Sequence, residues 1–399
     1  MGIALAGGAL LALRLGDPYR NPDSLAFEAL ARSVMAGRGL VYREPMLPGL
    51  DLYAFRSPGY GAFLAGALTL GGIRAAIALQ GALAALGALL WANLAARLGG
   101  SRAGLVTLVA TLGLGVAWTY AGELMTETLY TTLLALVMWL AHGMTERVRR
   151  GESPGVARVL GLGATLAAAV LTRPSGFALV GACVAVAVFQ PVVRRALVPA
   201  LVVALVLWSA WPLRNARVLG NPVPSLTSGG INAWQGATGR PIGEGWQIAS
   251  EHVSLGELGL DRMFWSLAGA EARAHPVAFL GRLVHKARDY VLPPGPRGGQ
   301  WTHALLWGPA LIGAGSLLRR TTPWRSAAVL PVAVWVGHAL LATITVSSDR
   351  YRFPTDDIVL LIGALGIETL LRRPGGVRGV LVVAACMMAG PALALLRHG

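Results

Sequence analysis

Long apolar runs, repeated from one end of the chain to the other, are the feature that most limits how this sequence can fold. A helix needs about 20 apolar residues to cross ~30 Å of hydrocarbon. Charged residues make up 13% and hydrophobic residues 55% of the 399 residues, outside the range typical of soluble domains. We therefore predict an all-α polytopic membrane protein. The apolar runs lie near 2–15, 73–96, 103–119, 124–142, 157–171, 175–190, 196–212, 301–318, 326–346, 355–371 and 378–396.

Short basic clusters between these runs predict the orientation of the chain. The formal net charge of +15 would suggest nucleic acid binding in a soluble domain, but here many arginines stand between apolar runs, so no nucleic acid partner is predicted. Successive clusters are separated by two runs and so share one face, which the positive-inside rule makes cytoplasmic. The clusters are Arg97/Arg102, Arg147/Arg149/Arg150, Arg194/Arg195, Arg319/Arg320/Arg325 and Arg372/Arg373/Arg378.

Counting spans from these clusters predicts about 11 transmembrane helices in a single domain, 1–399, with two large outer segments, 16–72 and 213–300. One part of the first is ambiguous: 57–72 is apolar and Gly-rich but would rise only about 22 Å as a helix. We favour a segment that lies in the interface or re-enters, because a span there would make 17–56 cytoplasmic. In the second outer segment, Gly, Pro and Asn predict irregular structure at 211–241. Apolar spacing predicts two interfacial helices at 261–293, broken at Pro276.

Two acids stand at outer ends of predicted helices. Asp23 follows Asn21-Pro22 and opens an amphipathic segment, so helix capping explains it when it is taken alone. Glu127 lies in the first turn of the helix that re-enters the bilayer, where the helix dipole favours a negative charge. A carboxylate at the edge of the hydrocarbon is nevertheless costly, which favours a function.

Several arginines are assigned to the same outer face. Arg350 and Arg352 lie in a predicted short outer loop, 347–354, against the positive-inside rule. Snorkelling to the interface is one explanation, and a compensating phosphate on a lipid-linked sugar is the other. Arg173 and Arg56 each stand close before a proline at an outer junction. Acids and arginines from distant segments thus predict a site for an anionic, membrane-anchored substrate.

No sequence signal indicates a metal or a cofactor. Cys183 and Cys386 both fall in apolar runs, the histidines are scattered, and no HExxH sequence or Gly-rich phosphate loop occurs. A divalent metal is compatible with the residues but is not indicated by them.

An ordered series of segments resembles the GT-C superfamily of polyprenyl-phosphate-sugar-dependent membrane glycosyltransferases, and within it the protein O-mannosyltransferase and aminoarabinose transferase branch. The likeness covers most of residues 1–370, and the order of the motifs is more specific than any one of them. The series is "DSLAFEALARSVMAGRGL", "RSPGYGAFLAGAL", "TETLY", "GLGATLAAAVLTRPSG", "PLRNARVLGNPVPSLTSGGIN", "HPVAFLGRLVHKARDYV" and "RYRFP".

The resemblance implies a GT-C-like helical bundle with interfacial helices and a catalytic acid in the first outer loop, 16–72, and acceptor contacts from 213–300. It implies an inverting enzyme that moves a sugar from a polyprenyl-phosphate donor to a lipid, glycan or protein acceptor. The site would face outward from a bacterial cytoplasmic membrane. By position in the motifs, Asp23 matches the catalytic acid, Glu127 a second acid, and Arg350, Arg352, Arg56 and Arg173 the groups that bind the donor phosphate.

One departure and two alternatives stand beside this hypothesis. Protein mannosyltransferases carry an Asp-Glu pair where this chain has Asp23-Ser24, which weakens protein mannosylation in particular. A flippase or transporter of lipid-linked sugars would instead show internal repeats and ionisable residues near the middle of the bilayer. A non-catalytic partner in an envelope complex would tolerate substitution of Asp23.

Overall fold

The structure is a computed structural model, which describes residues 1–113, 118, 120–291, 307, 309–315, 325–345 and 349–372. The predicted span at 378–396 and parts of the one at 301–318 lie outside these residues. The elements are α1 Gly2–Leu15, α2 Asp23–Met35, β1 Tyr42–Arg43, β2 Asp51–Leu52, α3 Pro58–Gly99, α4 Ser101–Gly113, α5 Thr126–Arg149, α6 Val156–Thr172, α7 Gly176–Phe189, α8 Pro191–Leu219, α9 Gly229–Thr238, α10 Ile242–Glu251, the 3-10 turn η1 Val253–Leu255, α11 Gly256–Ala274, α12 Pro276–Val291, α14 Arg325–Ile344 and α15 Asp349–Leu371.

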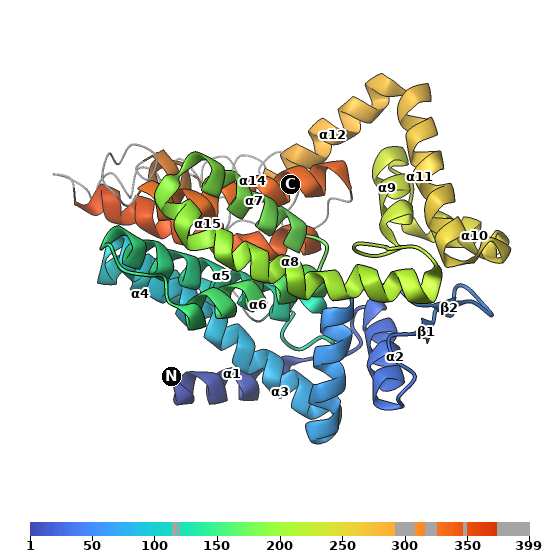
Figure 1. Ribbon diagram of the computed structural model, residues 1–399, viewed down its shortest axis with the longest axis horizontal. Coiled ribbons are helices and arrows are strands. Elements are labelled where there is room, and N and C mark those ends of the chain that lie inside the picture. Colours follow the sequence, from blue (N-terminus) through green and yellow to red (C-terminus); the bar gives the residue numbers. More distant parts are fainter. Residues whose placement is uncertain are drawn as a thin grey trace, which may run out of the picture.

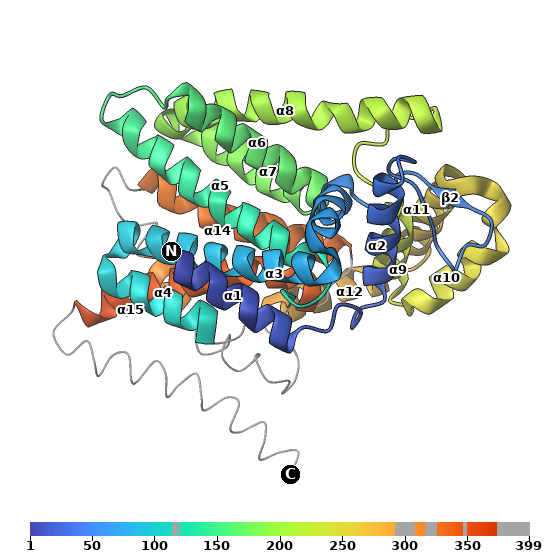
Figure 2. The same cartoon turned by 90° about the horizontal axis from the view of Figure 1, so that it is seen from below.

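A bundle of apolar helices forms most of the molecule. α1, α3 to α8, α14 and α15 lie alongside one another in both views (Figures 1 and 2). Within the described residues, α3, α5 and α8 are long and apolar enough to cross a membrane, and five shorter apolar helices accompany them. The prediction of a helical membrane protein is confirmed, while the number of spans stays a prediction.

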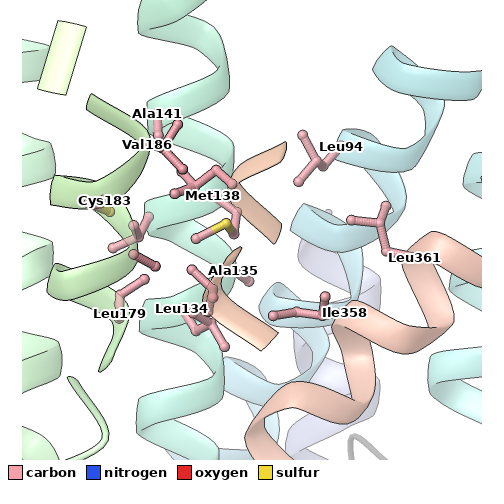
Figure 3. Close-up of a cluster of buried hydrophobic side chains, with 14 of the residues drawn as sticks. Leu94, Leu134, Ala135, Met138, Ala141, Leu179, Cys183, Val186, Ile358 and Leu361 are labelled. Carbon is pink, nitrogen blue, oxygen red and sulfur yellow. The ribbon is translucent and has the colours of Figure 1, made fainter. Parts of the chain in front are cut away.

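The core of the bundle joins segments that are far apart in the sequence. Figure 3 shows Leu94 of α3, Met138 of α5, Cys183 of α7 and Leu361 of α15 converging on one buried cluster. All are almost fully buried. Close packing of these side chains holds the helices together, because the hydrophobic effect does not drive association between helices surrounded by lipid.

A break in α3 divides the ambiguous apolar segment from the helix that follows. Gly71 and Gly72 leave helical geometry, and Gly72 has φ +67°, a conformation that glycine adopts without strain. The part of α3 before the break runs across the direction of the later part (Figure 1). This geometry is compatible with a segment that lies in the interface.

A smaller polar layer covers one end of the bundle. It consists of α2, the antiparallel pair β1–β2 with Tyr42 opposite Leu52, and the helices α9 to α11 (Figures 1 and 2). Glu257 connects its parts: its carboxylate accepts hydrogen bonds from Tyr53 N at 2.7 Å, Ala54 N at 2.8 Å and the Thr227 hydroxyl at 2.6 Å. Parts of the two segments that the sequence predicts to be outer, 16–72 and 213–300, therefore form one layer.

The prediction of irregular structure at 211–241 is wrong for 211–219 and 229–238, and is confirmed only for the short connections at 220–228 and 239–241. Helix α8 continues through Pro212 to Leu219, and α9 occupies Gly229–Thr238. Local propensity is outweighed by packing here, because Trp234 of α9 is buried against Phe264 of α11, with ring centroids 5.8 Å apart. The expected break at Pro276 is confirmed, since α11 ends at Ala274 and α12 begins at Pro276.

Candidate active site

Five charged side chains from five segments meet where the polar layer joins the bundle. Asp23 is the first residue of α2, Arg56 lies just before α3, Glu127 is in the first turn of α5, Arg173 caps the end of α6, and Arg350 is in the first turn of α15. We call these five residues the charge cluster. Sequence reasoning predicted each of them on the outer face, and the structure brings them together.

Asp23 is held between two guanidiniums. Its Oδ1 accepts a hydrogen bond from Arg56 at 2.7 Å, and its Oδ2 accepts one from Arg350 at 2.5 Å. Burial raises the pKa of Asp23, but the charges and hydrogen bonds of Arg56 and Arg350 outweigh it and lower the pKa to about 2. The helix-capping interpretation is wrong, because the Asp23 side chain makes no cap bond and its backbone N–H donates to Asn21 Oδ1 at 3.0 Å.

Glu127 forms the buried half of the cluster. Its side chain has 0% exposure, Arg173 lies 2.8 Å from its Oε1, and Arg350 Nε donates to the same oxygen. The Thr126 hydroxyl donates to Oε2 at 3.1 Å. A fully buried carboxylate needs such partners, so the helix dipole alone does not account for Glu127.

Arg350 is the link between the two acids. Its guanidinium contacts Asp23 of α2 and Glu127 of α5, which no compact ammonium group could do in the same fork geometry. Three guanidiniums face two carboxylates, so the cluster carries an excess of one positive charge. The side chains of Asp23 and Arg350 are 27% and 22% exposed, so the cluster opens to solvent at this pair.

Aromatic rings hold the arginines in place. The guanidinium of Arg56 lies 5.5 Å from the ring centre of Phe27 and 5.7 Å from that of Phe55, and Arg173 lies 5.5 Å from that of Tyr351. Sequence reasoning missed these rings. One signal was present, since Phe27 stands four residues after Asp23, on the same helix face.

Arg352 lies apart from the charge cluster. The prediction of a short loop at 347–354 is wrong from Asp349 onward, because α15 begins there. Two positions along a helix differ by about 200° in direction, which separates Arg352 from Arg350. Arg352 Nε instead donates to Asp356 Oδ1, one turn later, at 3.2 Å.

The part of the chain that the structure describes contains no group of three His, Cys, Asp or Glu residues placed to hold a metal ion. Asp23 and Glu127 each face arginine side chains. The oxygens of both carboxylates are thus engaged in ion pairs with guanidiniums.

Known proteins share this architecture at low sequence identity. No family model and no curated protein matches the sequence. The archaeal oligosaccharyltransferase AglB from Archaeoglobus fulgidus, solved with an inhibitory peptide and a dolichol-phosphate, is 13% identical with a TM-score of 0.58 over 98% of this chain and 54% of that one. Its complex with Zn and sulfate gives 14% identity and a TM-score of 0.56, over 98% and 51%. The chain therefore spans about half the length of that enzyme.

ArnT from Cupriavidus metallidurans, bound to undecaprenyl phosphate, is also similar, with 18% identity and a TM-score of 0.44 over 93% of this chain and 77% of that one. The identities are too low to show more than architecture, so the argument for the fold rests on the archaeal structures. The chain therefore shares the fold of the archaeal oligosaccharyltransferase, which agrees with the fold that the sequence resemblance implied.

Proposed function

We propose that the chain is an inverting glycosyltransferase that moves a sugar from a polyprenyl-phosphate donor to a cell-envelope acceptor at the outer face of the bacterial cytoplasmic membrane. The observation that carries the proposal is Arg350, whose guanidinium contacts both Asp23 and Glu127 at the solvent-facing opening of the charge cluster. An excess of positive charge beside a carboxylate suits a reaction in which a phosphate leaves and a hydroxyl loses its proton.

The arginines would bind the donor phosphate. Arg350 and Arg56 are partly exposed, more so than Arg173, and would receive it, while Arg173 stays with the buried Glu127. The charge that grows on the leaving phosphate is offset by these guanidiniums, a role worth several kcal/mol in general. Arg352 is hydrogen-bonded to Asp356 and would add to the positive electrostatic potential at the donor phosphate without contacting it.

Asp23 would act as general base on the acceptor hydroxyl. As the acceptor oxygen bonds to the anomeric carbon, the bond from that carbon to the phosphate oxygen breaks, and the hydroxyl proton passes to Asp23. A carboxylate with a pKa of about 2 is a weak base, so the resting ion pairs oppose this step. A phosphate that binds Arg56 and Arg350 would weaken their ion pairs with Asp23 and so raise the pKa of Asp23. Donor binding would thereby activate the base.

The test is transfer of radiolabel from a panel of polyprenyl-phosphate sugars to endogenous acceptors in membranes, with Asp23→Asn compared to the parent. Asp17→Asn is the control, because Asp17 is an exposed acid of the same outer segment and lies outside the charge cluster. We expect Asp23→Asn to abolish transfer at normal expression and Asp17→Asn to retain it. Unchanged transfer in Asp23→Asn would contradict its role as the base, and no transfer by the parent from any donor would favour a transporter.

A further inference from the structure

A cavity lined by charged side chains lies at the opposite end of the bundle from the charge cluster. It has a volume of about 450 Å³ and is formed by the end of α3, the end of α5 and the start of α6. Helix α5 begins at the charge cluster and has 24 residues, so its far end is about 36 Å away. The cavity is therefore separate from the site proposed for catalysis.

Positive charge dominates the lining of this cavity. Four arginines, Arg97, Arg147, Arg150 and Arg158, line it with a single carboxylate, Glu146. That carboxylate is 2.6 Å from a guanidinium outside the lining, and Arg147 pairs with Glu152 at 2.9 Å. Among the described residues, Arg97, Arg150 and Arg158 have no carboxylate partner.

One arginine is fixed at the cavity edge by its neighbours. Arg97 Nε donates to Asn93 Oδ1 at 2.8 Å, and its guanidinium lies 5.1 Å from the ring centre of Trp139. Trp139 Nε1 donates to the same Asn93 oxygen at 2.9 Å. This arrangement orders the guanidinium in advance, which lowers the entropic cost of binding an anion.

We propose that this cavity binds the phosphate headgroup of an anionic phospholipid from the adjacent leaflet. Basic cavities between transmembrane helices are suited to such headgroups, and guanidiniums bind phosphate oxygens in pairs. Trp139, which contacts Arg97, and Leu140 contribute apolar surface to the lining. A lipid can place an acyl chain against that surface while its phosphate meets the arginines, and a free phosphate ion uses only the arginines. The combination favours the lipid.

The test compares lipid retention by the purified full chain in native mass spectrometry, after reconstitution into nanodiscs of neutral lipid with or without cardiolipin. The variant is Arg150→Gln/Arg158→Gln, whose side chains are exposed and do not hold the fold. The matched control is Arg194→Gln/Arg195→Gln, two exposed arginines near the start of α8 that lie outside this cavity. We expect cardiolipin retention to fall about tenfold in the variant and to stay unchanged in the control.

A second arm distinguishes the source of the phosphate. Cardiolipin should raise the thermal unfolding midpoint of the parent, and inorganic phosphate added to neutral nanodiscs should leave it unchanged. Equal loss of cardiolipin in the variant and the control would overturn the proposal, since it would indicate a generally basic face. An equal rise with inorganic phosphate would overturn the lipid assignment. Neither measurement depends on glycosyl transfer.

Discussion

Arg350 shows at the scale of one residue how the candidate site is held together. Its guanidinium reaches a partly exposed carboxylate on one side and a fully buried one on the other. Removing one partner of a buried charge leaves the other uncompensated, at a cost of about 3–5 kcal/mol. Arg173 remains beside Glu127 in that case, so the loss should appear in activity more than in folding.

We expect Arg350→Gln to lower kcat/KM for transfer by at least about 100-fold, and Arg350→Lys to lower it nearly as much. The lysine keeps the charge but loses the planar fork that contacts both acids. The assay is transfer from the donor that the parent uses. Arg240→Gln is the control, because that arginine is exposed and pairs with Glu244 at 3.7 Å in the polar layer. Full activity of Arg350→Lys would show that only charge matters at this position.

The pKa of Asp23 predicts how activity depends on pH. In the parent, burial raises this pKa, but the arginines lower it by more, to about 2, so Asp23 stays ionised throughout the range from pH 4 upward. In Arg56→Gln the opposing charge of one arginine is lost, so the pKa rises and activity begins to fall at a higher pH on the acid side. The measurement is kcat/KM against pH, with Arg38→Gln, an exposed arginine of the same outer segment, as the control. Identical acid limbs for all three proteins would contradict this assignment.

At the scale of elements, Glu257 of α11 positions the segment that carries Arg56. Its contacts to Tyr53 and Ala54 lie just before that arginine, and Arg214 of α8 donates to Tyr53 O at 2.7 Å and to Leu40 O at 2.8 Å. A helix of the second outer segment and one of the bundle thus fix the chain of the first. The geometry of the charge cluster depends on both.

Glu257→Ala leaves two backbone N–H groups and one hydroxyl without their acceptor. We expect the free energy of unfolding to fall by about 3 kcal/mol and transfer to fall with it, because Arg56 loses its support. Glu251→Ala, at an exposed end of α10, should change neither. Thermal unfolding in detergent and the transfer assay check both expectations. A destabilised variant with normal kcat/KM would show that the contacts of Glu257 stabilise the polar layer but do not affect the charge cluster.

The structure of the whole molecule shows which features of the fold and of the candidate site could be predicted from the sequence. Charge patterning placed Asp23, Glu127 and Arg350 on one face, because the positive-inside rule depends on local composition. Their pairing could not be predicted, since it depends on how α2, α5 and α15 pack and on the start of α15 at Asp349, which sets the direction of Arg350. Helix α9 was missed for a related reason: burial of Trp234 overrides a Gly-rich local sequence.

Orientation in the membrane is the whole-molecule property on which the proposed function depends. A polyprenyl-phosphate donor on the outer face can reach the charge cluster only if the polar layer faces outward. Helix α10 lies in this layer, and α5 runs from the charge cluster toward the other end of the bundle (Figures 1 and 2). Glu251 is the last residue of α10, Glu152 follows the end of α5, and both are exposed. In a Cys183→Ala/Cys386→Ala background, we expect a membrane-impermeant maleimide to label Glu251→Cys in intact spheroplasts. Glu152→Cys should be labelled only after permeabilisation, because the positive-inside rule predicts that the arginine clusters hold that end in the cytoplasm. The reverse pattern would place the charge cluster on the cytoplasmic side and remove the basis for an outward-facing transferase.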